Sequence, residues 1–367
     1  MNWPMVKLHD ICRPKQWKTI AASSLLESGY PVYGANGKIG FYSKFTHEFP
    51  TLMITCRGAT CGNVHISEPM SYINGNAMAL DDLDRSKVDI KYLYYYFLKR
   101  GFDDVISGSA QPQITGQGLT KVVVPLPPLL EQKRIAAILD KAADIRQKRD
   151  QAIKLADDFL RTKFLEMFSL LEHGANKVKL GDIVALDAPM VDPKQEKYID
   201  LIHIGPDRIE KSTGLILPAL TARDENLISK KFLFDESYVL YSKIRPYLKK
   251  CAIPDFGGLC SADMYPVKPI TSKTNREFLW QLFLSDFFTK YTETLPDRAN
   301  IPKLNRKELL SFELSLPSIS LQENYKHIVQ KINHAKFVMR KQNSNNLLNK
   351  LLNDFFQKTS KQGNQNA

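Results

Sequence analysis

The chain has 367 residues, 43% of them hydrophobic, which fits a folded protein of about two domains rather than a disordered or fibrous chain. Its formal charge of +12, from 51 basic and 39 acidic side chains, favours a polyanionic partner such as nucleic acid. There is no apolar run of the roughly 20 residues that span a bilayer and no signal peptide, so we expect a cytoplasmic protein without membrane contact. The five cysteines include no CxxC pair, which excludes the usual zinc and redox motifs.

The first 128 residues predict a domain of short strands and turns. Alternating apolar segments such as "TLMITCRG" (51–58) are broken by Gly, Pro and Asn, a pattern typical of strands and turns. One aromatic-rich helix is centred on Leu93, and a polar loop then leads into the apolar strand "KVVVPLP" (121–127). We therefore expect a domain of mixed β-structure with helices over residues 1–128.

A long helix is predicted next, over residues 129–173. There is no proline or glycine between Glu131 and Glu172, and apolar residues recur at steps of three and four. This apolar stripe consists of Ile135, Ile138, Leu139, Ala142, Ile145, Ala152, Ile153, Ala156, Phe159, Leu160, Phe164 and Met167. At a rise of 1.5 Å per residue, such a helix is a rod of roughly 60 Å.

The second half of the chain repeats the first. "VKLHDI" (6–11) recurs as "VKLGDI" (178–183), the aromatic-rich helix recurs around Leu279, and "QPQITGQGLTKVVVPLP" (111–127) matches "NIPKLNRKELLSFELSLP" (300–317). The offset grows from 172 to about 186–190 along the chain, so the second copy carries an insertion of roughly 16 residues, which we expect before Arg245. The order predicts a second domain over 174–318, a second long helix over 319–360 and a polar tail over 361–367.

The second long helix also carries an apolar stripe, although weak helix formers occupy its middle at 341–346. Its stripe consists of Ile328, Ile332, Ala335, Met339, Leu348, Leu351, Leu352 and Phe355. Two such stripes are buried most simply by packing the helices on each other, antiparallel, with a globular domain at each end. The alternative is that each helix folds back on its own domain. We therefore predict an α+β protein: two similar domains, each followed by a long helix, the helices forming an antiparallel coiled coil.

The sequence contains no recognisable catalytic motif. GxGxxG, P-loop, NPP[YF], HExxH and GxSxG patterns are all missing, and the ExK tripeptide at 131–133 lies at a helix start without an acidic partner on a strand. We therefore expect a binding protein with no catalytic residues, no metal ligands and no cofactor of its own.

Three kinds of segment combine side chains that suit DNA. The first is the basic segment "YSKIRPYLKK" (241–250), whose counterpart in the first copy is "TCRGATCGN" (55–63), with Arg57 aligned on Arg245. The second is the pair of polar loops 107–118 and 295–306, which carry amides and arginines that pair with adenine and guanine. The third is the hairpin 33–44, which offers lysines to phosphates. Since each domain is nearly balanced in charge, a DNA-reading surface must come from such local clusters. The alternative for each segment is a solvated strand face or an ordinary surface loop. The candidate DNA-binding residues are Lys38, Lys44, Arg57, Asn63, Gln111, Gln113, Lys243, Arg245, Tyr247, Lys249, Lys250, Arg298, Asn300, Asn305 and Arg306.

The block "ISGSAQPQITGQGLTKVVVPLPPLLEQKRIAAILDKAADIRQKRD" (106–150), the two VKLxDI segments and the duplicated half-chain resemble the specificity subunit of type I restriction–modification systems. The second copy departs from the family at "LPSISLQEN" (316–324), which lacks the PPLxEQ form. The resemblance implies two target-recognition domains that each read half of a bipartite site in double-stranded DNA, and a coiled coil that sets the unread spacer. It also implies two modification subunits and restriction subunits as partners, to which S-adenosylmethionine, ATP and Mg would belong. Two alternatives remain: a two-headed coiled-coil scaffold without a DNA role, and the specificity half split from a fused methyltransferase–nuclease.

Overall fold

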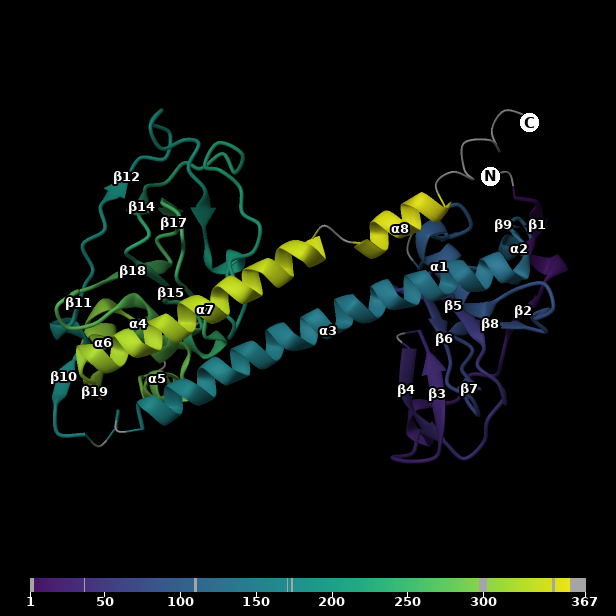
Figure 1. The fold of residues 1–367 in the computed structure, drawn as a ribbon, viewed down its shortest axis with the longest axis horizontal. Helices are drawn as coiled ribbons and strands as arrows, with labels where there is room; N and C mark the ends of the chain where they lie inside the picture. The colour runs from purple at the N-terminus through teal and green to yellow at the C-terminus, as the bar shows by residue number, and fades with distance from the viewer. Residues whose placement is uncertain are drawn as a thin grey trace. The chain divides into compact units, whose positions relative to one another are not determined.

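The computed structural model describes residues 3–35, 37–108, 111–169, 171–172, 174–296, 302–344 and 347–356. The chain divides into two compact units: unit 1 comprises Met1–Arg149 with Lys341–Ala367, and unit 2 comprises Asp150–Arg340. The boundary falls inside the long helix α3 (Leu129–Met167), so the two halves of this helix belong to different units. Both units mix strands and helices (Figure 1), which confirms the α+β class.

Unit 1 contains two sheets. In spatial order, the four strands of the first, all antiparallel, are β2 (Arg13–Gln16), β8 (Ala77–Asp81), β5 (Leu52–Thr55) and β6 (Val64–Ile66). The second consists of β4 (Gly37–Tyr42), β3 (Tyr30–Gly34) and β7 (Tyr72–Ile73), with β3 parallel to β7. A separate pair, β1 (Met5–Lys7) with β9 (Val123–Pro125), joins the start of this fold to its end. The short helices are η1 (Leu8–Asp10), η2 (Ala22–Ser24) and α2 (Gly116–Leu119).

The predicted aromatic helix is α1 (Ile90–Arg100), which anchors the core of unit 1. Asp89 caps its N-terminus, because its carboxylate accepts hydrogen bonds from two backbone N–H groups of the first turn. Helix α8 (Leu347–Phe356) lies next to α1 (Figure 1), and the ring of Phe356 packs edge-on against Tyr92 and Tyr96 at centroid distances of 5.7 and 5.6 Å. Helix α8, the last helix that the structure describes, therefore packs into the same hydrophobic core as the N-terminal part of the chain.

Unit 2 repeats this order of elements. Its four-stranded sheet is β11 (Val184–Ala185), β18 (Met264–Pro269), β15 (Val239–Ser242) and β16 (Cys251–Ala252), and β10 (Lys177–Lys179) pairs with β19 (Glu313–Ser315). Its second sheet is β12 (Met190–Val191), β14 (Lys231–Phe234), β17 (Gly258–Cys260) and β13 (His203–Ile204). Its helices are η3 (Leu180–Asp182), η4 (Pro206–Arg208), η5 (Pro246–Leu248), α4 (Arg276–Leu284), α5 (Asp286–Glu293) and α6 (Arg306–Ser311). The four-stranded sheet of unit 1 recurs in unit 2 with the same strand order and directions, and the pair β1–β9 recurs as β10–β19, so the predicted duplication is confirmed. The second sheets differ, because the described part of unit 2 has no counterpart of the β3–β4 hairpin.

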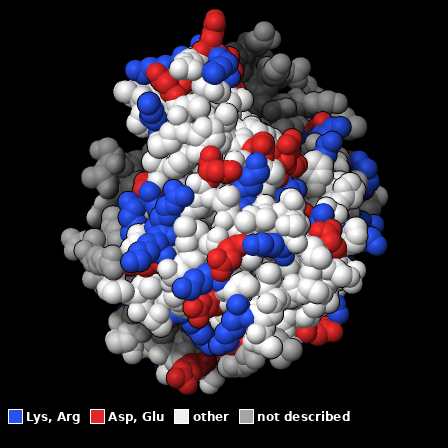
Figure 2. Space-filling view, turned by 90° about the vertical axis from the view of Figure 1, so that its left-hand side faces the viewer, with Lys and Arg blue, Asp and Glu red and all other residues white. Residues whose placement is uncertain are grey.

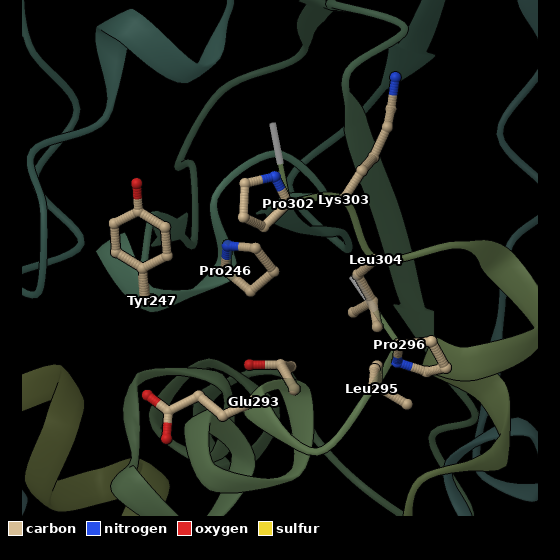
Figure 3. Close-up of a pocket in the computed structure, with 9 residues that line it drawn as sticks. Pro246, Tyr247, Glu293, Leu295, Pro296, Pro302, Lys303 and Leu304 are labelled. Atoms are coloured by element: carbon tan, nitrogen blue, oxygen red, sulfur yellow. The ribbon is translucent and has the colours of Figure 1, made fainter. Parts of the chain in front are cut away.

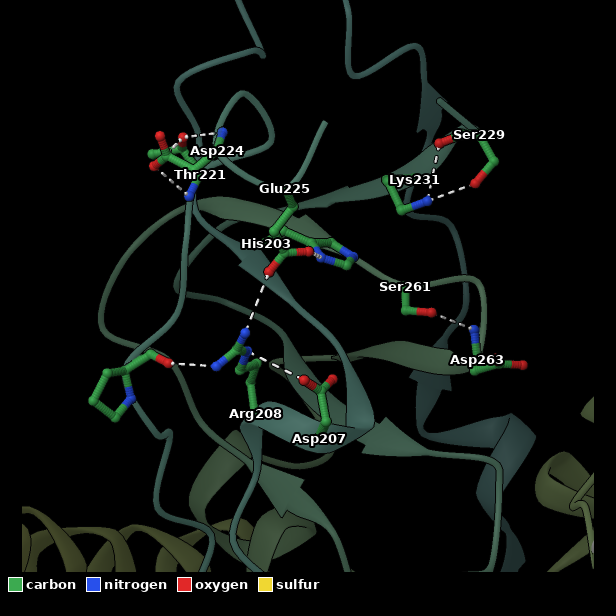
Figure 4. Close-up of polar contacts among 11 residues, drawn as sticks. His203, Asp207, Arg208, Thr221, Asp224, Glu225, Ser229, Lys231, Ser261 and Asp263 are labelled. Atoms are coloured by element: carbon green, nitrogen blue, oxygen red, sulfur yellow. Dashed lines mark hydrogen bonds and ion pairs between the residues drawn. The ribbon is translucent and has the colours of Figure 1, made fainter. Parts of the chain in front are cut away.

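Backbone hydrogen bonds locate the insertion of the second copy. In unit 1, the carbonyl oxygen of Tyr33 accepts a hydrogen bond from the residue that follows β7. In unit 2, the carbonyl oxygen of Ile204 accepts the same bond from the residue that follows β17, so Tyr33 and Ile204 are equivalent and differ by 171 in number. His47 pairs with Ser71, immediately before β7, and Phe234 pairs with Gly258, the equivalent first residue of β17, so these two residues differ by 187. The 16 additional residues therefore lie between Ile204 and Phe234, before Arg245 as predicted. In this stretch the carboxylate of Glu225 is hydrogen-bonded to Nδ1 of His203 (2.8 Å) and forms an ion pair with Arg208 (3.8 Å) (Figure 4).

Within unit 2, the second half of α3 packs against α7 (Ile319–Ser344) in antiparallel orientation. Tyr325, early in α7, donates a hydrogen bond to the carbonyl oxygen of Leu160 (3.1 Å), whereas Lys336, later in α7, pairs with Asp157, earlier in α3. The antiparallel packing expected from the stripes is thus present, although α3 also contributes Leu160 to the core of unit 2.

Two details of the predicted long helices are wrong. Phe159 and Ile145, assigned to the buried stripe of α3, are 48% and 41% exposed. Successive helical residues are about 100° apart, so a seam that buries Leu160 turns Phe159 toward solvent. The second long helix is divided into α7 and α8, and residues 345–346 between them, in the segment of weak helix formers, lie outside the described residues.

Candidate nucleic-acid interface

In unit 2, backbone hydrogen bonds join two of the segments that the sequence singled out. The N–H of Arg245, in the loop after β15, donates to the carbonyl oxygen of Pro302 (2.8 Å). The N–H of Leu304 donates back to the carbonyl oxygen of Lys243 (2.8 Å), and Ile244 lies opposite Lys303 in an antiparallel bridge. The basic segment and the polar loop before α6 therefore form one surface, although they are about 60 residues apart in sequence.

Unit 1 joins the corresponding segments by the same bonds. Gly58 N–H donates to the carbonyl oxygen of Pro112 (3.2 Å), Ile114 N–H donates to that of Cys56 (3.0 Å), and Arg57 lies opposite Gln113. The predicted basic hairpin also exists, as β3 and β4.

The turn of this hairpin is tied to the loop after β5. The carbonyl oxygen of Ala35 accepts hydrogen bonds from the hydroxyls of Thr55 (2.8 Å) and Thr60 (3.1 Å). All three of the segments proposed for DNA contact in the first copy therefore converge on one region of unit 1.

The predicted alignment of Arg57 with Arg245 is wrong by one residue. Since Gly58 and Arg245 make the same hydrogen bond, Arg245 corresponds to Gly58, and Arg57 corresponds to Ile244. Both Gly58 and Arg245 lie in the left-handed region, with φ of 86° and 49°. Glycine adopts this conformation freely, whereas an L-residue such as arginine is strained there. The sequence comparison matched the side chains, but backbone pairing defines the position.

The basic side chains of the loop after β15 fall into two groups. Arg245 is exposed, Tyr247 is 50% exposed, and the ammonium of Lys243 lies 5.6 Å from the ring centroid of Tyr265. Burial, followed by the charge of Lys303, lowers the pKa of Lys243. An anion placed beside these two ammonium groups would relieve their repulsion.

Lys249 and Lys250 point into unit 2 instead. Lys249 forms an ion pair with Asp286, and Lys250 donates to the carbonyl oxygen of Pro206 (2.6 Å). These bonds connect the loop to the inserted stretch and to α5, so both amines already have partners within the protein.

The candidates in the loop before α6 differ in their surroundings. Asn305 caps α6, because its side-chain oxygen accepts from the N–H of Glu308 (2.9 Å). The exposed Arg306 donates to the carbonyl oxygen of Leu186 (3.3 Å). Arg298 and Asn300 lie outside the described residues.

The candidates in unit 1 are all exposed. This group consists of Lys38, Lys44, Arg57, Asn63, Gln111 and Gln113. Lys38 pairs with Glu68 at 3.2 Å, a contact between solvent-exposed charges that contributes little to stability. These side chains are therefore accessible to a ligand without rearrangement of the core.

Sequence reasoning missed Asp263 and Lys303 in unit 2. The Lys303 ammonium lies 3.3 Å from a carboxylate oxygen of Asp263, and the side chains are 52% and 42% exposed. Lys303 also lines a cavity of about 210 Å³, together with Pro246 and Pro302, and its side chain is directed away from Glu293 (Figure 3). Lys303 follows a proline matched between the copies, which was a usable signal, but nothing in the sequence linked it to Asp263.

Charge on the visible face in Figure 2 is mixed, with Lys and Arg interspersed among Asp and Glu. Such a surface agrees with the expectation that basic clusters are local. Among the described residues, no three His, Cys, Asp or Glu side chains are grouped so that they could hold a metal ion. No helix in the described part of the chain is long and apolar enough to cross a membrane.

The chain matches the family of the type I restriction modification DNA specificity domain over residues 1–155. It is 38% identical over 135 residues to the specificity subunit of the type I restriction enzyme EcoDI of Escherichia coli, covering 37% of this chain and 29% of that subunit. It is 20% identical over 396 residues to the MjaVIII specificity subunit of Methanocaldococcus jannaschii, covering 93% of this chain and 88% of that subunit.

The same class appears among solved structures. The S subunit of a type I restriction–modification system from M. genitalium has this fold, with a TM-score of 0.66 over 98% of this chain and 96% of that one, at 16% identity. The chain is therefore similar to type I specificity subunits, in sequence over residues 1–155 and in fold over almost its whole length. The matches to the EcoDI and EcoprrI subunits span about a third of the length of those relatives, 29% and 34%.

Proposed function

We propose that the chain is the sequence-specific DNA-binding subunit of a type I restriction–modification complex, and that units 1 and 2 each read one half of a bipartite target. The observation that carries the proposal is the repeated backbone pairing, Arg57 with Gln113 in unit 1 and Ile244 with Lys303 in unit 2. At one of these equivalent positions both side chains are exposed and polar, the amide of Gln113 in unit 1 and the ammonium of Lys303 in unit 2, which suits the reading of two separate base sequences.

The partners in this proposal are two modification subunits and the restriction subunits of the same system. S-adenosylmethionine, ATP and Mg are bound by those subunits, and this chain is non-catalytic and acts in the cytoplasm. The match of residues 1–155 to the specificity-domain family, and the similarity to the EcoDI specificity subunit, support this division of labour.

Within unit 2, we assign base contact to Arg245 and phosphate contact to Lys243. Arginine offers two parallel donors that match O6 and N7 of guanine, and Arg245 is exposed at the surface. Within unit 1, we assign base contact to Arg57, Gln111 and Gln113, whose side chains are also exposed.

The decisive experiment selects bound sequences from a random duplex library with the full chain, and then measures affinity over a salt series. We expect two conserved half-sites separated by an unread spacer, and a steep loss of affinity with salt as phosphate contacts release counterions. The two-headed scaffold predicts neither selection nor a salt slope.

Exchange of residues 1–128 for the equivalent domain of another specificity subunit tests whether units 1 and 2 each read their own half-site. One half-site should change while the other is kept. Methyl transfer to DNA by the isolated chain with added S-adenosylmethionine would contradict the assignment of this chain as a non-catalytic subunit.

A further inference from the structure

Two positions of the shared framework carry different chemistry in the two units. Asn76 and Asp263 are equivalent, because their carbonyl oxygens accept the N–H of Cys56 (3.0 Å) and of Lys243 (3.1 Å), which occupy the same place after β5 and β15. Gln113 and Lys303 are equivalent through their bridges to Arg57 and Ile244. Unit 1 thus has an amide at both positions, and unit 2 has a carboxylate and an ammonium.

The Asp263–Lys303 pair has the spacing of a base-pair edge. Its oxygen and nitrogen are 3.3 Å apart, and both side chains remain about half exposed, at 42% and 52%. The backbone N–H of Asp263 donates a hydrogen bond to the hydroxyl of Ser261 (3.1 Å), which leaves the carboxylate of Asp263 out of this bond (Figure 4). In a C·G pair, the N4 amino group of cytosine and O6 of guanine are hydrogen-bonded to each other at about 2.9 Å and both face the major groove.

We propose that Asp263 and Lys303 determine specificity in unit 2 by reading one C·G base pair of its half-site. The carboxylate of Asp263 accepts from the cytosine N4 amino group, and the ammonium of Lys303 donates to O6 and N7 of guanine. The inference rests on the proposed DNA-binding function and adds the base pair and the residues that select it.

The chemistry of the pair excludes the reversed orientation. A G·C pair would place O6 opposite the carboxylate, two acceptors together, and N4 opposite the ammonium, two donors together. An A·T pair keeps the donor and acceptor in place, but thymine offers only O4 and a methyl group where guanine offers O6 and N7. The discrimination between correct and reversed pair should be roughly 5- to 150-fold, which corresponds to the usual effect of a good base contact.

The sharpest test exchanges the two charges in the full chain, as Asp263→Lys with Lys303→Asp. The ion pair is retained, so the fold has no new unpaired charge. Selection from a random duplex library should return G·C where the unaltered chain returns C·G, at one position of one half-site, with the other half-site unchanged. The inference is overturned if the exchanged chain binds and still selects C·G, or if the unaltered half-site has no such position.

A second double variant, Asp263→Asn with Lys303→Gln, installs the amides that the same framework carries in unit 1. It should lose at least about 5-fold of the preference for C·G at that position, because amides pair best with adenine. Lys307→Gln, an exposed lysine of α6, is the matched control for loss of a positive charge and should keep the C·G preference. If all chains, the unaltered one included, select no sequence, the proposed function itself fails. If all bind with one unchanged motif, only the assignment of Asp263 and Lys303 fails.

Discussion

Replacing Asp157 by asparagine should destabilise unit 2 by about 3–5 kcal/mol, the usual cost of removing one partner from a buried ion pair. Lys336 is 3% exposed and its partner Asp157 is 12% exposed, so neither charge is well hydrated. After the substitution, the ammonium keeps the neutral side-chain oxygen of Asn333 at 3.2 Å as a partner. A charge in these surroundings has lost most of its hydration without an opposite charge to offset the loss.

The same pair predicts a pH dependence with a definite sign. Burial lowers the pKa of Lys336 below its ordinary 10.5, and Asp157 opposes that shift, so Asp157→Asn should lower this pKa further. Below the folded-state pKa, both states hold the proton and the full penalty applies. Between that pKa and 10.5 the unfolded chain binds more protons, so the free energy of unfolding rises with pH. The deficit of the variant should therefore shrink toward alkaline pH.

Urea unfolding of the full chain measures the effect, because the buried Trp280 lies in unit 2 and reports on it by fluorescence. Asp158→Asn is the matched control: Asp158 is 54% exposed in its pair with Arg161, and its loss should change stability by less than about 1 kcal/mol. Asp157→Leu with Lys336→Met removes both charges and should recover most of the loss. If Asp157→Asn costs no more than the Asp158 control, the pair is not buried as the packing of α3 and α7 indicates.

Three further predictions concern the loop after β15 and its support. Arg245→Gly should relieve the left-handed strain at φ 49° and stabilise unit 2 by about 0.5–1 kcal/mol in urea unfolding, while it weakens selection at one half-site; a loss of stability would show that the conformation is not strained. DNA affinity should decline with rising pH before the ordinary lysine pKa of 10.5 is reached, because the pKa of Lys243 is lowered. Lys243→Arg should remove that early decline in a binding titration. An identical pH profile for both chains would contradict the assignment of Lys243 to a phosphate. Gly214→Ala should destabilise unit 2 by about 2 kcal/mol or more in thermal unfolding. The φ of Gly214 is +72°, and the new Cβ would overlap Trp280 Nε1 and lie 2.8 Å from the carbonyl oxygen of Cys251. A variant as stable as the parent would mean that the inserted stretch does not pack there.

The sequence by itself determined the duplication, the type and order of the elements, and the size and position of the insertion. These follow from local patterns: period-2 and period-3.6 apolar spacing, turn residues, and matched segments at a nearly constant offset. It also singled out the segments that the structure brings together after β5 and β15, because clusters of basic and amide side chains are visible without knowledge of the fold.

Only the tertiary structure decided which residues share a surface. That Gly58 rather than Arg57 corresponds to Arg245 depends on a hydrogen bond to Pro112 or Pro302, more than 50 residues further along the chain. That Lys249 turns inward depends on Asp286 of α5, and the Asp263–Lys303 pair exists because the turn before β18 and the loop before α6 both pack on the loop after β15. Such pairings are set by the burial and register of strands that are distant in sequence, so the spacing of residues along the chain does not predict them.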